Sequence, residues 1–162
     1  MEKEITEVYC GNGRGKTTLA IGQALRASSQ GKSVIIIQFL KGNERRELDF
    51  LEELDQLDIK IFRFEKMETC YDQLNEEEQV EEERNILNGL NFARKVIATQ
   101  ECDFLVLDEI LGLLDKHIAT VDMVVGLLKQ KDESMHLILT GNRVDPGILD
   151  YVDSVTTITT LG

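Results

Sequence analysis

Tryptophan is absent from this 162-residue chain, and Pro146 is its only proline. No apolar run approaches the roughly 18 residues of a membrane helix. Without Pro-, Gly- or Ser-rich stretches, nothing marks a linker between domains. Residues 2–4 are all charged, which disfavours a secretory signal. We therefore expect residues 1–162 to form one soluble, unsecreted domain that is not a membrane protein.

Basic residues are also scarce. Against 30 Asp and Glu stand only 18 Lys and Arg, which gives a formal net charge of -12. Broad binding to nucleic acid or to an anionic membrane requires a basic face, so neither is expected as a partner. Any anionic ligand must be held by a small local site.

The cysteines are few and widely spaced. There are three of them, Cys10, Cys70 and Cys102, and none forms a CxxC pair. This arrangement indicates neither a disulfide framework nor a zinc site. Reduced thiols fit a cytoplasmic protein best.

Short β-branched segments alternate with longer helical patterns, which is typical of βαβ units around a mainly parallel sheet. Strands are expected at residues 4–9, 33–38, 59–64, 103–108, 135–140 and 154–159. Helices are expected at residues 16–29, 44–56, 75–99, 109–116, 121–131 and 146–151. Several strands are apolar on both sides, so helices should cover both faces of the sheet.

The longest predicted helix has clear signals at its start and along its core face. Asn75 is suited to the N-cap position. Helical spacing predicts a buried stripe made of Ile86, Leu90, Ala93 and Ile97. We interpret the acidic run at residues 76–83 as a solvated face without chemistry.

The sequence CGNGRGKTT, residues 10–18, joins the first predicted strand to the first predicted helix. Glycine amides can form an anion nest there, beside the positive end of the helix. A lysine can then contact phosphate oxygens, and a threonine hydroxyl suits Mg²⁺. The strict pattern GxxxxGK[ST] fails at Cys10. The candidate nucleotide-binding residues are Gly11, Asn12, Gly13, Arg14, Gly15, Lys16, Thr17 and Thr18.

A second element, FLVLDE at residues 104–109, is an apolar strand that ends in two carboxylates. In P-loop proteins an acid here holds the Mg²⁺ that bridges nucleotide phosphates. Asp108 taken alone is equally suited to cap the following helix. Lys41 and Arg143 follow two other strands, where ligands of open α/β sheets bind. His117 and His136 are isolated in the sequence, and we interpret both as structural.

These pieces together resemble the ATP:corrinoid adenosyltransferases of the CobA/BtuR type (cob(I)yrinic acid a,c-diamide adenosyltransferase). The matching segments are VYCGNGRGKTTLAIGQALRA, VIIIQFLKG, DFLVLDEI, LILTGN and ILDYVDSVT, in the family's order and spacing. The likeness covers nearly the whole chain. The family loop, GNGKGKTT, also follows a non-glycine residue.

The resemblance implies an α/β fold: a P-loop NTPase-like (RecA-like), mainly parallel sheet of about six strands, often dimeric. It implies transfer of the 5'-deoxyadenosyl group of MgATP to Co(I) of a corrinoid, with release of triphosphate. Lys16 and Glu109 would be the catalytic residues. The remaining roles would be Thr17, Asp108 and Glu109 for Mg²⁺; Lys41 and Arg143 for ATP; and Phe64, Met67 and Tyr71 for the corrinoid.

Two alternatives stay open. One is an ATP-binding family member without transferase activity, since residues 64–71 depart from the aromatic cluster usual in the family and the chain has no tryptophan. The other is a generic small P-loop ATPase or kinase. The lack of an arginine-rich lid for phosphoryl transfer disfavours this second alternative.

Overall fold

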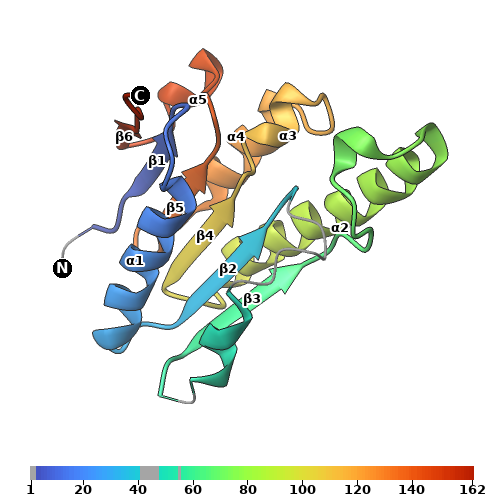
Figure 1. The fold of residues 1–162 in the computed structure, drawn as a ribbon. Coiled ribbons are helices and arrows are strands. Elements are labelled where there is room, and N and C mark those ends of the chain that lie inside the picture. The colour runs from blue at the N-terminus through green and yellow to red at the C-terminus, as the bar shows by residue number, and fades with distance from the viewer. Residues whose placement is uncertain (1–2, 41–47, 55) are drawn as a thin grey trace.

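A computed structural model describes residues 3–40, 48–54 and 56–162. Six strands form one sheet in the order β3-β2-β4-β5-β1-β6, and every pairing is parallel. The strands are β1 (Thr6–Cys10), β2 (Val34–Gln38), β3 (Ile59–Arg63), β4 (Phe104–Asp108), β5 (His136–Thr140) and β6 (Ser154–Thr157). Figure 1 shows β3 and β6 at the two edges. The predicted α/β fold with a parallel six-stranded sheet is confirmed.

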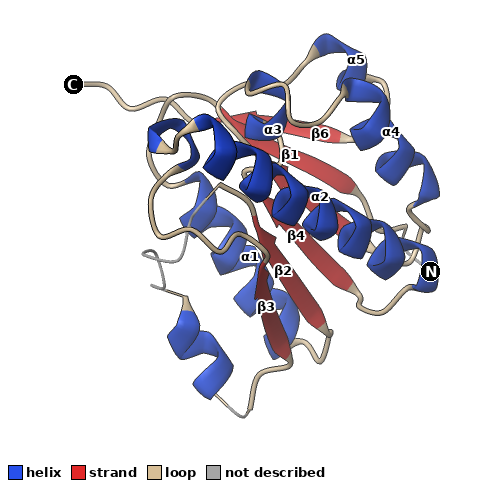
Figure 2. Cartoon of the chain, turned by 90° about the vertical axis from the view of Figure 1, so that its right-hand side faces the viewer, coloured by secondary structure: helices blue, strands red, loops and turns tan. Residues whose placement is uncertain are grey.

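Helices cover both faces of this sheet. The α-helices are α1 (Lys16–Ser29), α2 (Glu76–Thr99), α3 (Gly112–Asp115), α4 (Val121–Gln130) and α5 (Pro146–Leu149). Two short 3-10 helices, η1 (Asp49–Glu53) and η2 (Tyr71–Gln73), complete the described elements. Helix α1 covers one face, and α2 and α4 cover the other (Figure 2). Within the described residues, no helix has both the length and the apolar character needed to cross a membrane.

The strands are buried on both sides because alternate residues point to different helices. Ile36 and Val106 pack with α1, which contributes Ala20, Ile21, Ala24 and Ala27. Ile37 and Leu107 face the opposite layer, to which α2 contributes the predicted stripe of Ile86, Leu90, Ala93 and Ile97. All four residues of that stripe are buried, as the helical spacing predicts.

The start of α2 also agrees with its sequence signals. The side chain of Asn75 accepts a hydrogen bond from the amide of Glu78 at 2.9 Å. Glu78 returns the contact, since its carboxylate accepts from the amide of Asn75 at 3.1 Å. This capping box fixes the helix start and therefore the position of the segment that precedes it.

Three predicted helices differ from the structure in their extent or their type. The helix expected at 109–116 begins only at Gly112, because Glu109 has a φ of 65° and interrupts helical geometry. The described part of the helix expected at 44–56 is the 3-10 helix η1, with hydrogen bonds such as Leu54 N–H to Leu51 at 3.2 Å. The helix expected at 146–151 ends at Leu149.

Because all strands are parallel, their carboxyl ends lie side by side along one edge of the sheet, which runs across all six strands. Three neighbouring strands end there in buried polar residues, namely Gln38 of β2, Asp108 of β4 and Thr140 of β5. The glycine-rich loop follows β1 at the same edge. Ligands of open α/β sheets bind at the carboxyl ends of the strands, so a ligand site is expected at this edge.

Candidate functional site

The loop of residues 10–18 leaves β1 and leads directly into α1 (Figure 1). Gly11 has a φ of 109°, in the left-handed region that residues with a Cβ rarely adopt. At Gly13 the constraint is space, because a Cβ would lie 2.6 Å from the carbonyl oxygen of Ile158. The amide of Gly13 donates to that oxygen at 2.8 Å. Backbone conformation and close packing thus require glycine at these two positions.

Cys10 does not occupy a position that needs glycine. It is the last residue of β1 and lies opposite Thr157 of β6 in the sheet register. Its side chain is buried, and its Sγ lies 3.7 Å from Oγ1 of Thr157. The departure from the strict GxxxxGK[ST] pattern therefore falls on a strand residue.

Lys16 points back across the loop. Its Nζ donates to the carbonyl oxygens of Gly11 at 2.7 Å and Gly13 at 3.2 Å. A third hydrogen bond, of 3.2 Å, goes to Oδ1 of Asn142 in the loop after β5. The first turn of α1 has no acidic residue, so the positive end of the helix is not neutralised there. The lysine and the helix end together attract an anion, whose oxygens can replace these neutral acceptors.

A cavity of about 290 Å³ opens beside the loop. Its lining consists of Gly13, Arg14, Gly15, Lys16, Thr17, Thr18 and Glu109. Six of the predicted nucleotide-binding residues thus line one cavity together with Glu109, and two of the predicted metal ligands, Thr17 and Glu109, are among these lining residues. The volume lies at the small end of the range for ligand sites, which suits a chain of phosphates better than a whole nucleotide.

Asp108 lies at the centre of the polar cluster behind this cavity. The hydroxyl of Thr17 donates to both of its carboxylate oxygens, at 2.9 and 3.2 Å. Thr140 donates to Oδ1 at 2.8 Å, and Gln38 donates to Oδ2 at 3.1 Å. Asp108 is fully buried, and α3 has Leu111 rather than Asp108 at its N-cap position. The alternative that Asp108 caps the following helix was therefore wrong.

Glu109 is held in an unfavourable backbone conformation at the wall of the cavity. Its φ of 65° is uncommon for a residue with a side chain. The hydroxyl of Thr140 stabilises it, because it accepts a hydrogen bond from the amide of Glu109 at 2.8 Å. Thr140 thus contacts both acidic residues and orients Glu109 toward the cavity that Glu109 lines.

The oxygen atoms around the loop fit Mg²⁺ better than a metal bound by protein side chains alone. Among the described residues, no group of three or more His, Cys, Asp and Glu side chains is arranged to hold a metal ion. Mg²⁺ usually takes only one or two carboxylates and completes its shell with phosphate oxygens and water. Thr17, Asp108 and Glu109 supply such a partial set.

The predicted corrinoid residues lie apart from the nucleotide cavity. Phe64 packs against Phe92 of α2, with ring centroids 5.5 Å apart. Met67 is half-buried in the loop after β3. The hydroxyl of Tyr71 donates to Glu83. The pKa of Tyr71 is raised to about 12, mainly because the hydroxyl is partly buried and also because of this hydrogen bond. The three side chains share one loop and its junction with α2, and none lines the nucleotide cavity.

One residue of the acidic run is not solvated, contrary to the interpretation from sequence. Glu82 is only 2% exposed. Its carboxylate accepts hydrogen bonds from the amides of Lys66 at 2.9 Å and Met67 at 3.2 Å. Asn85 adds a third, at 2.7 Å. Glu82 therefore anchors the loop that carries the predicted corrinoid residues.

Arg143 lies outside the nucleotide cavity, and its Nε donates to Asp115 at 2.8 Å. This ion pair lines a second cavity, together with His117. Lys41, the other predicted cation, lies outside the described residues. Of the two basic residues predicted after other strands, the structure therefore positions only Arg143.

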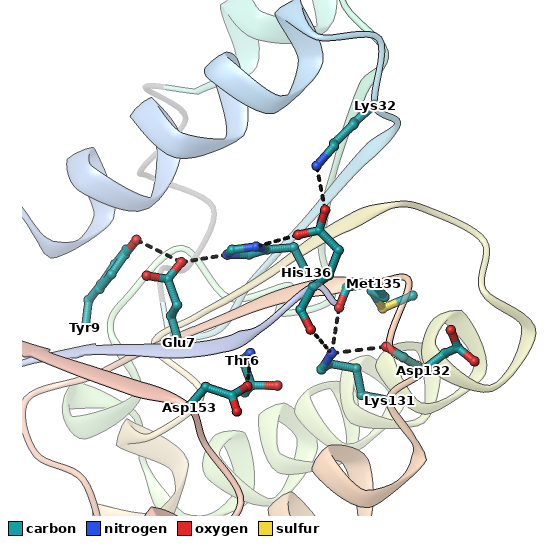
Figure 3. A network of polar contacts seen from close by, with 10 residues as sticks. Thr6, Glu7, Tyr9, Lys32, Lys131, Asp132, Met135, His136 and Asp153 are labelled. Atoms are coloured by element: carbon teal, nitrogen blue, oxygen red, sulfur yellow. Dashed lines mark hydrogen bonds and ion pairs between the residues drawn. The ribbon is translucent and has the colours of Figure 1, made fainter. Parts of the chain in front are cut away.

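His136 is the first residue of β5, so it lies at the opposite end of the strands from the glycine-rich loop. Its Nε2 lies 2.6 Å from a carboxylate oxygen of Glu7 (Figure 3). Its Nδ1 lies 3.2 Å from a carboxylate oxygen of Glu4. Lys32 donates to the other carboxylate oxygen of Glu4 at 2.8 Å. The ring of His136 also stacks on Phe104, with centroids 4.6 Å apart. This network joins four segments of chain and is remote from the glycine-rich loop.

Sequence reasoning missed three residues of the site: Gln38, Thr140 and Asn142. Gln38 and Thr140 each end a strand in which the three preceding residues are apolar, and both are buried. A lone polar residue at the carboxyl end of a buried strand is the signal that could have revealed them. Asn142 contacts Lys16 through a pairing between distant segments, for which the sequence carries no local signal.

Comparison with solved structures agrees with the fold. A KaiC-like protein from Pyrococcus horikoshii OT3 superposes with a TM-score of 0.60 at 18% sequence identity. The superposition covers 94% of this chain and 70% of that one. At this identity the likeness concerns the fold alone, and it supports the P-loop NTPase-like architecture.

Sequence comparison is more specific. The corrinoid adenosyltransferase of Escherichia coli is 31% identical over 159 residues, which span 95% of this chain and 76% of the relative. The corrinoid adenosyltransferase CobA of Salmonella typhimurium is 29% identical over 157 residues, with the same coverage. The family model for the ATP:corrinoid adenosyltransferases BtuR/CobO/CobP matches residues 2–161. The chain, with its glycine-rich loop and buried Asp108, therefore belongs to the ATP:corrinoid adenosyltransferase family.

Proposed function

We propose that this protein transfers the 5'-deoxyadenosyl group of ATP to Co(I) of a corrinoid and releases triphosphate. One observation carries the proposal: the family loop is joined through Thr17 to a buried Asp108 at the carboxyl edge of the sheet. The family match over residues 2–161 supplies the reaction class. The alternatives of a phosphoryl-transferring ATPase or kinase have no comparable support.

In this proposal the loop holds the triphosphate of ATP. The side chain of Lys16 and the positive end of α1 offer donors and positive charge to it. The amides of Gly11, Gly13 and Arg14 donate within the chain, to Asn142, Ile158 and Thr160, so these three do not form the anion nest expected from the sequence. Thr18 and Arg14 line the same cavity. Lys16 is the catalytic cation, because it neutralises charge that grows on the leaving group. Lys41 remains a predicted ATP ligand, as does Arg143, although the position of Arg143 beside Asp115 favours another role.

Mg²⁺ fits this site through oxygen atoms of the chain. Thr17 would bind it through the hydroxyl, and Glu109 through a carboxylate at the cavity wall. Asp108 accepts hydrogen bonds from three side chains, so it acts best by orienting the Thr17 hydroxyl. When bound, the ion supplies positive charge that stabilises the leaving triphosphate.

The transfer needs no nucleophile from the protein. The electron pair of Co(I) forms the bond from cobalt to C5', and the bond from C5' to oxygen breaks. The electron pair of the broken bond from C5' to oxygen leaves with triphosphate, and cobalt is formally oxidised to Co(III). The chain has to hold the two substrates in line, and such positioning can lower a barrier by roughly 7–11 kcal/mol. Phe64, Met67 and Tyr71 are the proposed corrinoid surface.

The test is incubation with MgATP and chemically reduced cobinamide. The expected products are adenosylcobinamide and triphosphate in equal amounts. ADP with phosphate would instead indicate phosphoryl transfer, and ATP binding without any product would indicate a family member that has lost the activity. A Lys16→Ala variant should lose transfer, while the exposed-residue control Lys60→Ala should retain it.

The resemblance also leads us to propose a cytoplasmic homodimer. Analytical ultracentrifugation of the purified chain tests the dimer, and fractionation of cells tests the location.

A further inference from the structure

Arg63, Gln38 and Asp108 form one row across three neighbouring strands (Figure 1). Gln38 of β2 lies opposite Arg63 of β3 on one side and opposite Asp108 of β4 on the other. Residues that pair in this way in a parallel sheet point to the same face. The residues two positions earlier in these strands all pack with α1, namely Ile61, Ile36 and Val106. The side chains of the row therefore lie on the face of the sheet that α1 covers.

Hydrogen bonds connect this row from one end to the other. The Nε of Arg63 donates to Oε1 of Gln38 at 2.8 Å. The Nε2 of Gln38 then donates to Oδ2 of Asp108 at 3.1 Å. A guanidinium only donates and a carboxylate only accepts, so the amide of Gln38 fits between them in one orientation. Because Gln38 is only 4% exposed, the loss of Arg63 would leave a buried amide oxygen without this donor.

The row ends at the hydroxyl that is proposed to bind Mg²⁺. Thr17 donates its proton to Asp108 at 2.9 Å, which leaves the lone pairs of the hydroxyl oxygen for a cation. Gln38 and Thr140 each hold one carboxylate oxygen of Asp108, so the carboxylate keeps the orientation that this hydrogen bond needs. Arg63 brings positive charge to the chain of hydrogen bonds, and the members of such a chain strengthen one another. The direction of the Thr17 hydroxyl therefore depends on Arg63.

Arg63 lies at a distance from the nucleotide cavity. It is half-buried, and it is not among the described residues that line this cavity. Two strand spacings, roughly 10 Å in all, separate its backbone from that of Asp108. An effect of Arg63 on the nucleotide is therefore expected to pass through Gln38.

The start of the loop of residues 64–71 holds Arg63 in place. Two residues after Arg63, the buried carboxylate of Glu65 accepts a hydrogen bond from the amide of Leu40. Leu40 follows β2, so this contact joins the chain after β3 to the chain after β2. The end of β3, and Arg63 with it, is thereby fixed beside the end of β2.

We propose that Arg63 is a positioning residue of the nucleotide site, which fixes the Thr17 hydroxyl for Mg²⁺ through Gln38 and Asp108. The inference rests on the metal role proposed for Thr17, and it extends the site to the edge strand β3. Arg63 itself contacts neither the metal nor the nucleotide in this proposal.

Equilibrium binding of ATP in the absence of any corrinoid tests the proposal, by isothermal titration calorimetry with and without Mg²⁺. Arg63→Met keeps a side chain of similar length and removes the donor. This variant should bind MgATP about fivefold more weakly and should bind ATP without Mg²⁺ as the wild type does. Arg63→Lys retains a charged donor, so it should bind MgATP within about twofold of the wild type.

A double-mutant cycle with Thr17→Ala separates positioning from a merely structural role. Because Arg63 is proposed to act through the Thr17 hydroxyl, Arg63→Met should have almost no further effect on MgATP affinity once that hydroxyl is gone. Lys60→Ala removes an exposed cation from the same strand, so it is the matched control and should bind MgATP normally.

Three results would overturn the inference: wild-type MgATP affinity in Arg63→Met, an equal loss of affinity with and without Mg²⁺, or independent effects of the two substitutions in the cycle. In each case, weaker MgATP binding by Thr17→Ala and adenosyl transfer by the wild-type chain would leave the proposed function standing. Normal MgATP binding by Thr17→Ala would instead remove the metal role of Thr17, and this inference with it.

Discussion

The hydroxyl of Thr17 donates to Oδ1 of Asp108 across 2.9 Å and so joins the first turn of α1 to the end of the central strand β4. We predict that Thr17→Ala raises the KM for MgATP about tenfold, because the variant loses the hydroxyl proposed to bind the metal. Steady-state kinetics at several Mg²⁺ concentrations measures the effect. Thr99→Ala, on the far end of α2, is the control and should match the wild type.

If Thr17→Ala bound MgATP normally, the role proposed for this hydroxyl would be wrong, and Glu109 alone would have to hold the ion.

Gly11 combines a left-handed φ with contact to the backbone of residue 158. A Cβ at this position would lie 2.3 Å from the carbonyl oxygen of Ile158. Gly11→Ala should therefore lower the free energy of unfolding by about 2 kcal/mol or more and abolish ATP binding. The control is Gly22→Ala in α1, where nothing lies within 4 Å of an added Cβ.

Gly22→Ala should raise stability by about 0.5 to 1 kcal/mol, since it replaces a helical glycine. Chemical denaturation measures both variants. Equal stability of the two would contradict the steric argument.

Glu82 holds the loop of residues 64–71 by accepting from two backbone amides. Glu82→Gln places an amide group where only acceptors fit, and at least one buried N–H loses its partner. We expect a loss of about 1 to 3 kcal/mol in stability and a higher KM for the corrinoid with an unchanged KM for ATP. Glu81→Gln, which is exposed, should have neither effect. A parallel rise in both KM values would show that Glu82 supports the whole domain instead.

Glu4 provides a test of pH dependence. Its hydrogen bond from Lys32 is the main cause that lowers its pKa from the ordinary value of 4.5. A carboxylate with a lowered pKa stabilises the folded state above that ordinary value, and this contribution disappears as the pH falls through the pKa of the folded state. The wild-type chain should thus be more stable than Glu4→Gln at pH 7, and the difference should shrink below about pH 4.5.

Denaturant titrations at both pH values test this expectation, with Glu133→Gln on the exposed surface as the comparison. A difference that grew as the pH fell would refute it.

Local patterns predicted most of the architecture. The apolar strands, the cap at Asn75 and the stripe from Ile86 to Ile97 depend on neighbours in sequence, so periodicity was enough to find them. The loop at residues 10–18 and the acid at 108 were predicted together because parallel strands bring their carboxyl ends to one edge.

What sequence missed depends on contacts between distant segments. The burial of Glu82 results from the loop after β3 folding back on α2, and nothing in an acidic run reveals which carboxylate will turn inward. The φ of Glu109 similarly depends on Thr140, a residue 31 positions later. Helix propensity alone therefore placed the start of α3 too early.

The contact of the glycine-rich loop with the segment after β6 has a consequence for synthesis. Arg14 and Thr160 are 146 positions apart, yet the amide of Arg14 donates to the hydroxyl of Thr160 at 2.9 Å. A ribosome releases the loop long before it makes residues 158–160. The nascent loop therefore lacks these native supports until β6 has docked, so the capacity to bind ATP should arise only after most of the sheet has folded.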